Sequence, residues 1–336
     1  MQLGAHHFPD PPVFLAPMAG VSDRPFRLLA RRLGASAAVS EMVTSQQQLW
    51  DSAKSRHRLD HTAEPAPRIV QLLGNEPGAL AAAARENVAR GADIIDLNLG
   101  CPAKKVCSRA AGSALMGDTG LVRELLQALS ENAGVPVTLK MRLGLDPERM
   151  NAGVIAGIAA DAGIAMLTVH GRTRAAGYRG EADHDAVARV VAATDLPVLA
   201  NGDIRSIADA RQVLQRTGAT GVMIGRGAQG RPWLPGQIRA ALAGQAVPPD
   251  PEPSAIASLM REHIAALHRQ YGPHQGVRIA RKHIGWYLEH LGRGEADTRT
   301  LRAELFALED AGAQLRRLDA MFPSGDSPAD DSGRAA

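Results

Sequence analysis

A thiol and an amide follow directly on an apolar run in the first third of the chain. Residues 94–97 have the composition of a buried strand, and Asn98, Gly100, Cys101 and Pro102 come next. Because glycine and proline end a strand ladder, we expect Asn98 and Cys101 to lie at the carboxyl end of that strand. Enzymes built from parallel β/α units carry their catalytic groups at that end. Cys101 is therefore a candidate catalytic residue, although a lone cysteine can equally be an inert core side chain.

Basic and amide side chains follow several other apolar runs. Lys140 and Arg142 alternate along one of them, so both should face the same side of the strand. Two glycine-containing segments, 201–203 and 225–227, follow the last two runs. Basic groups that meet at one mouth favour a bound anion, and the turns after the last two strands are the usual phosphate site of a TIM barrel. Backbone N–H groups there, together with Arg226, can hold a phosphate.

Eight short apolar runs alternate with helical patterns over about 240 residues. The expected strands are residues 13–16, 37–40, 69–72, 94–97, 137–139, 166–169, 198–200 and 222–224. The clearest helical patterns are residues 77–90, 118–132, 148–162 and 207–216. Eight strand–helix units favour an α/β fold of the (β/α)8 TIM-barrel type over an open doubly wound sheet. No G-x-G-x-x-G fingerprint opens the first helix, which also disfavours a dinucleotide-binding sheet.

The composition narrows the class of protein. The 336-residue chain has a formal net charge of +3 and two cysteines, Cys101 and Cys107. Two cysteines this close argue against a disulfide framework and for a reducing compartment, so we expect a cytoplasmic protein. The N-terminus lacks a signal-peptide pattern, and no apolar run reaches membrane-spanning length. Residues 323–336 hold three aspartates against one arginine. We expect them to be a disordered tail, which leaves a mild basic bias on the rest.

Six motifs, within a match that runs from about residue 9 to residue 287, resemble the tRNA-dihydrouridine synthases, and the bacterial B-type subfamily fits best. They are residues 16–23, 98–102, 111–116, 170–174, 201–204 and 225–230. The resemblance implies an FMN-dependent oxidoreductase that uses NADPH to reduce a uridine of the tRNA D-loop to 5,6-dihydrouridine. The implied flavin contacts are Pro17, Met18, Ala19, Gln71, Lys140 and His170, and the implied phosphate contacts are Asn201, Gly202, Asp203, Gly225 and Arg226.

The substrate side is assigned in the same way. Asn98 would bind the uracil, Cys101 would donate a proton, and the implied tRNA contacts of the barrel are Arg142, Arg172 and Arg174. Hydride that arrives at C6 of uracil leaves charge that needs a proton at C5. A cysteine with an ordinary pKa of about 8.5 is protonated at neutral pH and can supply that proton. Lys140 would favour the anionic reduced flavin by charge attraction.

A tRNA base must leave its stack to reach a barrel mouth, so such an enzyme needs a second RNA contact. Residues 246–253 contain four prolines and are expected to be a linker to a helical domain, residues 254–322. Within 277–287 the apolar positions share one helical face, and Arg278, Arg281 and Lys282 share another. An ordinary solvated basic face has the same pattern. Next to a barrel that modifies RNA, tRNA binding is the favoured interpretation.

Two alternatives stay open from the residues alone. A flavin barrel of the dihydroorotate dehydrogenase type would share the barrel and the strand-end asparagine, but it has no use for a basic helical appendage. An RNA-binding protein without catalysis would need the helices but not the polar strand ends. We expect residues 1–245 to be the catalytic barrel of an enzyme that is monomeric and needs neither a metal nor a membrane.

Overall fold

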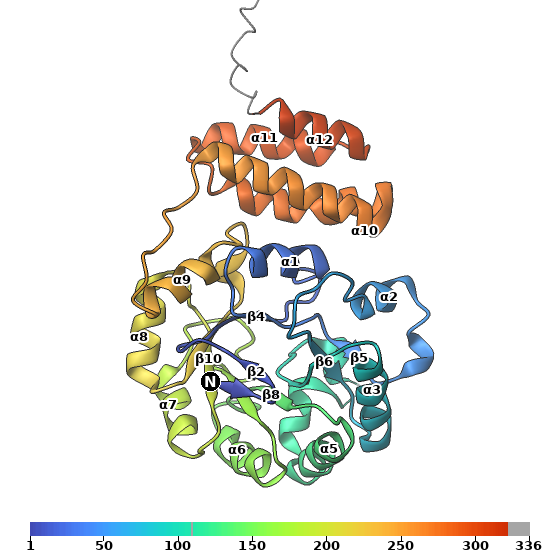
Figure 1. The fold of residues 1–336 in the computed structure, drawn as a ribbon, viewed down its shortest axis with the longest axis vertical. Coiled ribbons are helices and arrows are strands. Elements are labelled where there is room, and N and C mark those ends of the chain that lie inside the picture. The colour runs from blue at the N-terminus through green and yellow to red at the C-terminus, as the bar shows by residue number, and fades with distance from the viewer. Residues whose placement is uncertain (109, 322–336) are drawn as a thin grey trace, which may run out of the picture. The chain divides into compact units, whose positions relative to one another are not determined.

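The computed structural model describes residues 1–108 and 110–321, so the expected disordered tail, residues 323–336, lies outside the described residues. The chain divides between Pro249 and Asp250 into two compact units. Figure 1 draws the first as a ring of strands and helices and the second as a group of helices.

Nine parallel strands form the sheet of the first unit, in the order β4-β3-β11-β10-β9-β8-β7-β6-β5. The strands are β3 (Val13–Leu15), β4 (Ala37–Ala38), β5 (Val43–Thr44), β6 (Ile69–Leu73), β7 (Ile94–Leu99), β8 (Val137–Arg142), β9 (Met166–His170), β10 (Val198–Asn201) and β11 (Gly221–Ile224). A bridge between Val39 and Ile69 joins the β4 end of this order to β6, so the sheet curls round on itself (Figure 1). The expected TIM-barrel fold with a helical C-terminal region is confirmed.

The expected second strand, residues 37–40, is interrupted. Within that range only β4 is a strand, and β5 starts beyond it, at Val43; at Ser40 the side chain replaces part of the backbone ladder. The Ser40 hydroxyl accepts the backbone N–H of Gln71 at 3.1 Å and donates to the carbonyl of Glu41 at 3.0 Å. The break turns Met42 toward the mouth of the barrel, where it lines the cavity described below.

Helices connect the strands around the ring. They are α1 (Arg24–Arg32), α2 (Ala53–Leu59), α3 (Pro77–Ala89), α4 (Lys104–Cys107), α5 (Thr119–Asn132), α6 (Ala152–Asp161), α7 (His184–Ala192), α8 (Ile207–Thr217) and α9 (Leu234–Leu242), with 3-10 turns at Gln47–Leu49, Gly112–Gly117 and Arg226–Ala228. The expected helices agree with α3, α5 and α8 to within one residue at each end. The fourth, α6, starts four residues later than residue 148, since Asp146 accepts the backbone N–H of Arg149 at 3.0 Å and closes a separate turn there.

The amino end of the barrel is filled by apolar side chains. The hairpin of β1 (Gln2–Leu3) and β2 (His6–His7) brings Leu3 and Phe8 into one buried cluster with residues at the starts of the strands. Phe8 and Phe14 stack with ring centroids 5.0 Å apart. A filled amino end leaves the carboxyl ends of the strands as the open face, which is where a TIM barrel carries its active site.

The second unit consists of α10 (Pro253–Leu288), α11 (Glu295–Ala307) and α12 (Ala311–Asp319). The backbone of α10 is interrupted at Gly272, with φ 79° and ψ 170°, and Pro273 starts its second half. The two halves lie against each other, since a Cβ on Gly276 would lie 2.7 Å from the Cα of His268. Within the described part of the chain, no helix has both the length and the apolar character needed to cross a bilayer.

Candidate active site

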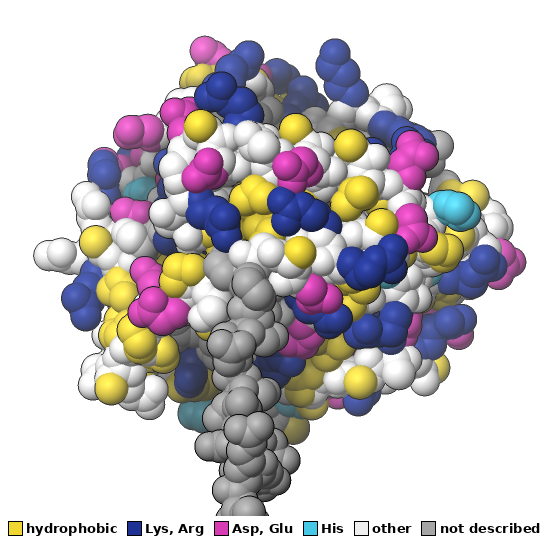
Figure 2. Space-filling model, turned by 90° about the horizontal axis from the view of Figure 1, so that it is seen from above, with side chains coloured by type: hydrophobic (Ala, Val, Ile, Leu, Met, Phe, Trp, Pro, Cys, Tyr) yellow, Lys and Arg dark blue, Asp and Glu magenta, His cyan; other side chains and the backbone are white. Residues whose placement is uncertain are grey.

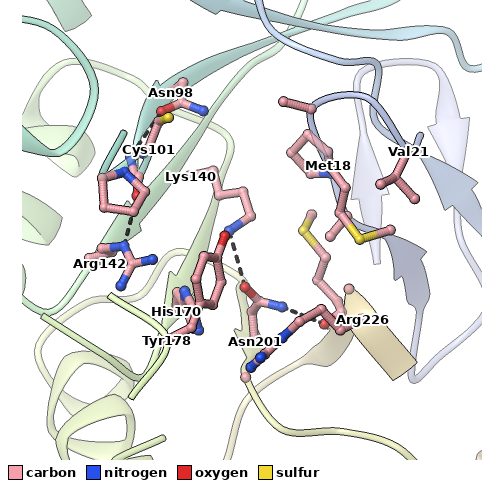
Figure 3. A pocket seen from close by; sticks show the side chains of 18 of the residues that line it. Met18, Val21, Asn98, Cys101, Lys140, Arg142, His170, Tyr178, Asn201 and Arg226 are labelled. Carbon is pink, nitrogen blue, oxygen red and sulfur yellow. Dashed lines mark hydrogen bonds between the residues drawn. The ribbon is translucent and has the colours of Figure 1, made fainter. Parts of the chain in front are cut away.

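A cavity of about 520 Å³ opens at the carboxyl ends of the barrel strands and lies within the usual size range for ligand sites. Figure 3 shows side chains from opposite sides of the ring that line it. The expected site residues that line it are Pro17, Met18, Ala19, Gln71, Asn98, Cys101, Lys140, Arg142, His170, Asn201, Gly202, Asp203, Gly225 and Arg226. These residues come from seven segments that are far apart in the sequence, and the barrel brings them to one place.

Lys140 is the central cation of this cavity. It lies on β8, is 9% exposed, and its Nζ donates to Asn201 Oδ1 at 3.1 Å (Figure 3). The Asn201 amide is fixed in turn, because its Nδ2 donates to the carbonyl of Met223 at 2.8 Å. Burial and the nearby Arg142 lower the pKa of Lys140 from 10.5 to about 8. Lys140 is therefore still charged at neutral pH, and an anionic group in the cavity would keep it so.

His170 is neutral in this setting. It ends β9, and burial together with Lys140 and Arg142 lowers its pKa to about 2. A neutral imidazole has one N–H donor and one acceptor nitrogen. His170 can therefore hydrogen-bond a polar ligand without adding charge.

Cys101 is held in a tight loop at the end of β7. Its backbone N–H donates to Asn98 Oδ1 at 2.9 Å, and its carbonyl accepts from the Ser113 hydroxyl at 2.9 Å. The thiol of Cys107 lies against the same carbonyl, with its Sγ 3.5 Å from the oxygen. Burial raises the pKa of the Cys101 thiol above its ordinary value. A protonated thiol at neutral pH fits a proton donor better than a nucleophile.

The turns after β10 and β11 bring backbone close to the cavity. Gly202 has φ +125°, and a Cβ there would lie 2.7 Å from the Cβ of Ala182. A Cβ on Gly227 would lie 2.3 Å from the carbonyl oxygen of Ile204. Only glycine fits at these two positions, and the close approach of backbone suits a phosphate cradle.

Asp203 forms ion pairs with three arginines in this part of the site. Its Oδ2 accepts from Arg172 Nη2 at 2.6 Å, and its Oδ1 lies 3.4 Å from Arg226 Nη2 and 3.7 Å from Arg205 Nη2. Arg226 and Arg205 remain 46% and 67% exposed at the side chain. Three arginines around one carboxylate leave excess positive charge at the mouth.

Three arginines expected on the substrate side are placed differently from one another. Arg142 lines the cavity, but its guanidinium is occupied by three carbonyls, those of Gly100, Thr173 and Gly177, at 2.7–2.9 Å. Arg172 is 3% exposed and lies behind His170. Arg174 is half-buried and does not line the cavity. Arg142 and Arg172 therefore hold the loops of the site in place. Arg142 does so through its hydrogen bonds to backbone carbonyls, and Arg172 through its hydrogen bond to Asp203.

Sequence reasoning missed Tyr178, an exposed aromatic at the mouth. Its ring lies over two guanidinium groups, with Arg226 Cζ at 4.8 Å and Arg142 Cζ at 5.5 Å from the centroid, and its ring centroid is 6.2 Å from that of His170. Two features of the sequence could have drawn attention to Tyr178. Aromatic residues make up only 3% of the chain, and Tyr178 comes in the segment after a strand end. Met42, Arg205 and Gln229 also line the cavity and were not expected.

The basic residues of α10 belong to the second unit. The apolar face expected next to them is confirmed, because Val277, Ala280, Ile284 and Tyr287 are all buried. Of the three basic residues on the other face, Arg278 is exposed. Arg281 is half-buried and donates to the carbonyl of Leu308 at 3.2 Å, and Lys282 is half-buried. Figure 2 shows Lys and Arg side chains interspersed with Asp and Glu on the face it presents.

The chain matches the family model described as dihydrouridine synthase (Dus) over residues 14–324. The tRNA-dihydrouridine synthase B of Pseudomonas syringae pv. tomato is 51% identical over 313 residues, which cover 93% of this chain and 92% of that protein. The protein of the same name from Escherichia coli K12 is 48% identical over 308 residues, or 91% and 94% of the two chains.

Solved structures support the fold alone. Histamine dehydrogenase from Rhizobium sp. 4-9 superposes with a TM-score of 0.55 at 13% identity, over 79% of this chain and 50% of that one. The chain thus spans about half the length of that structure. The family model and the relatives go further than the fold: the chain belongs to the dihydrouridine synthase family.

Proposed function

We propose that the chain is a tRNA-dihydrouridine synthase that reduces a D-loop uridine with NADPH. The observation that carries this proposal is the thiol of Cys101 in the same cavity as the buried Lys140, in a chain that matches the Dus family over residues 14–324. The name of its close relatives supports tRNA as the substrate. A dihydroorotate dehydrogenase or a non-catalytic RNA-binding protein is not supported by these relatives.

The cofactor is a flavin, and we propose FMN. The cavity offers two kinds of group that suit the two parts of that molecule. Amides, a neutral imidazole and a cation would hold the ring and ribityl chain: Gln71, Lys140 and His170, with the loop Pro17, Met18 and Ala19. The glycine turns and the exposed Arg226 would hold the phosphate, with Asn201, Gly202, Asp203 and Gly225.

A bound reduced flavin supplies a hydride to C6 of the uracil. The protein's own groups do the rest of the work. Cys101 holds a proton and delivers it to C5, and the raised pKa of its thiol keeps that proton in place at neutral pH. Asn98 lines the cavity, and its carbonyl oxygen accepts the backbone N–H groups of Gly100 and Cys101, while its NH2 has a second hydrogen besides the one it donates to Gln71. That donor suits a carbonyl oxygen of uracil.

The remaining assignments concern the RNA. We propose that residues 1–245 form the catalytic domain, that 246–253 link it to the helices, and that 254–322 bind tRNA. Arg278 is the best-placed phosphate contact of its face because it is the exposed member. Arg281 and Lys282 flank it, and Arg174 is the barrel's candidate. The enzyme acts as a monomer in the cytoplasm, where its tRNA substrates lie, and needs no metal. No group of three or more His, Cys, Asp or Glu that could hold a metal ion occurs among residues 1–108 and 110–321.

The test uses the purified full-length protein. Its heat-released cofactor should have the mass of FMN, NADPH should bleach the flavin absorbance, and an unmodified tRNA transcript should gain two hydrogen atoms at a D-loop uridine. Free uridine should be a poor substrate. Turnover of dihydroorotate, or the absence of flavin, would refute the proposal.

A further inference from the structure

A buried chain of polar side chains lies beneath the cavity, and two of its members, Thr138 and Asp96, have no role in the chemistry above. It starts at Thr138 on β8, whose hydroxyl donates to Asp96 Oδ1 at 2.6 Å. Gln71 Nε2 donates to Asp96 Oδ2 at 2.7 Å, and Asn98 Nδ2 donates to Gln71 Oε1 at 2.7 Å. Asn98 Oδ1 then accepts the backbone N–H groups of Gly100 and Cys101.

The order of donors and acceptors along this chain is set from one end by Asp96. An ionised carboxylate only accepts hydrogen bonds, so the group of Gln71 that faces it must be the NH2. The carbonyl oxygen of Gln71 then faces Asn98 and requires the NH2 of Asn98. At the far end, backbone N–H groups only donate and require the carbonyl oxygen of Asn98. Both ends thus demand the same orientation of both amides.

Asp96 is 2% exposed, and a carboxylate is a costly residue to bury. Burial raises its pKa to about 6, although Thr138 and Gln71 both stabilise the ionised form. An apolar side chain would fill this position in the barrel at lower cost, as the neighbouring Ile95 and Leu97 do on the other side of β7. Fully satisfied buried polar networks of this kind fix one arrangement of their members.

We propose that Asp96 is a positioning residue, which orients Gln71 and Asn98 and thereby fixes the backbone of the Cys101 loop. The carboxylate touches neither substrate nor cofactor; it acts through two amides. The proposal deepens the proposed function, since it rests on Asn98 and Cys101 as the substrate-side groups of that reaction. Charge compensation of Lys140 is the competing explanation, because both carry charge in the same core.

Two substitutions at Asp96 separate the two explanations. In Asp96→Asn the new amide can accept from Gln71 with its oxygen and donate to the Thr138 hydroxyl, so the order of donors survives without the charge. Asp96→Leu removes the acceptor altogether. Thr138→Val is the matched control, since the carboxylate still accepts from Gln71. Asp96→Ala, which also removes the acceptor and adds no volume to the core, is the reserve for Asp96→Leu.

Turnover of tRNA per bound flavin is the first readout. We expect Asp96→Leu and Asp96→Ala to fall about ten- to hundredfold, the range for a buried donor that loses its partner. Asp96→Asn and Thr138→Val should each stay within about threefold of wild type. Asp96→Ala decides the question if Asp96→Leu fails to fold.

The second readout needs no reaction. The rate of alkylation of Cys101 by iodoacetamide, measured in a Cys107→Ser background, reports the position of the loop. It should rise in Asp96→Leu and Asp96→Ala and stay unchanged in Asp96→Asn and Thr138→Val. Equal loss of turnover in Asp96→Asn and Asp96→Leu would assign the effect to charge and overturn the proposal. An alkylation rate that is unchanged in both variants that remove the acceptor would overturn it too. If the wild type does not reduce tRNA, the proposed function fails, and the alkylation rates still test Asp96.

Discussion

Replacing the buried Lys140 by Met should weaken the binding of the cofactor without making the protein less stable. The change keeps the side-chain volume and removes the charge. Lowering the pKa of Lys140 from 10.5 to about 8 corresponds to a cost of about 3 kcal/mol for holding the cation in the barrel at pH 7. The substitution removes that cost but leaves Asn201 Oδ1 without its donor, which costs about 1–3 kcal/mol. The free energy of unfolding of the flavin-free variant should therefore equal that of the wild type or exceed it by up to about 2 kcal/mol.

The pH dependence of the unfolding free energy identifies Lys140 as the source of this cost. Between pH 8 and 10.5 the unfolded chain holds a proton on Lys140 that the folded protein has released. The wild-type unfolding free energy should therefore rise with pH across this window, by up to about 1.4 kcal/mol per pH unit relative to the variant. Below pH 8 the two curves should run parallel.

The affinity for FMN, in contrast to the stability, should fall in Lys140→Met. Losing a charge-assisted contact weakens affinity about ten- to hundredfold. The assay is urea denaturation of the flavin-free proteins over pH 7–10.5, with FMN titration followed by fluorescence quenching. Lys105→Met, a change at an exposed lysine of α4, is the matched control and should alter neither quantity. A variant that is destabilised by several kcal/mol yet binds FMN normally would refute this assignment of Lys140.

The other predictions address the acid, the phosphate end and the RNA. Cys101→Ala should keep its FMN and its reduction by NADPH while tRNA turnover falls about 10²–10⁴-fold, measured by stopped-flow absorbance of each half-reaction; a loss in Cys107→Ala instead would move the acid to the other thiol. Arg226→Ala should lower FMN retention on dialysis about tenfold or more, and full retention would count against the phosphate assignment. Arg278→Ala should weaken tRNA binding and flatten the plot of log K against log salt by up to about 0.9, more than Arg281→Ala or Lys282→Ala; Arg317→Ala, an arginine paired with Glu304, is the control. If a triple Ala variant at Arg278, Arg281 and Lys282 kept the wild-type slope, this face would be an ordinary solvated face that does not bind tRNA.

The ends of the strands could be predicted from the sequence because the signals there are local. Apolar runs that stop at glycine, proline or a polar residue mark the carboxyl ends, and the barrel then brings those ends together. This is why the residues expected to contact the flavin all line one cavity. The interruption between β4 and β5 could not be predicted in this way, because it depends on a hydrogen bond from Gln71, 31 residues away, to the Ser40 side chain.

The direction of side chains in loops could not be predicted from the sequence either. Arg172 follows β9 in a loop without a two-residue period, so nothing in the sequence indicated that it would turn inward to Asp203. Asp96 is the opposite case. It precedes Asn98 by two residues on the same strand, so alternation places both side chains on one face. That spacing would have been sufficient to associate the buried carboxylate with the site, but residues 94–97 were interpreted only as a buried strand.

The most direct test of the central claim is mass spectrometry of tRNA from a strain that lacks this protein, complemented with the wild type or with Cys101→Ala. We expect dihydrouridine to be missing from at least one D-loop position in the deletion strain. The wild type should restore it, and Cys101→Ala should not, although that variant is made and carries FMN. Undiminished dihydrouridine in the deletion strain, or full restoration by Cys101→Ala, would contradict the account.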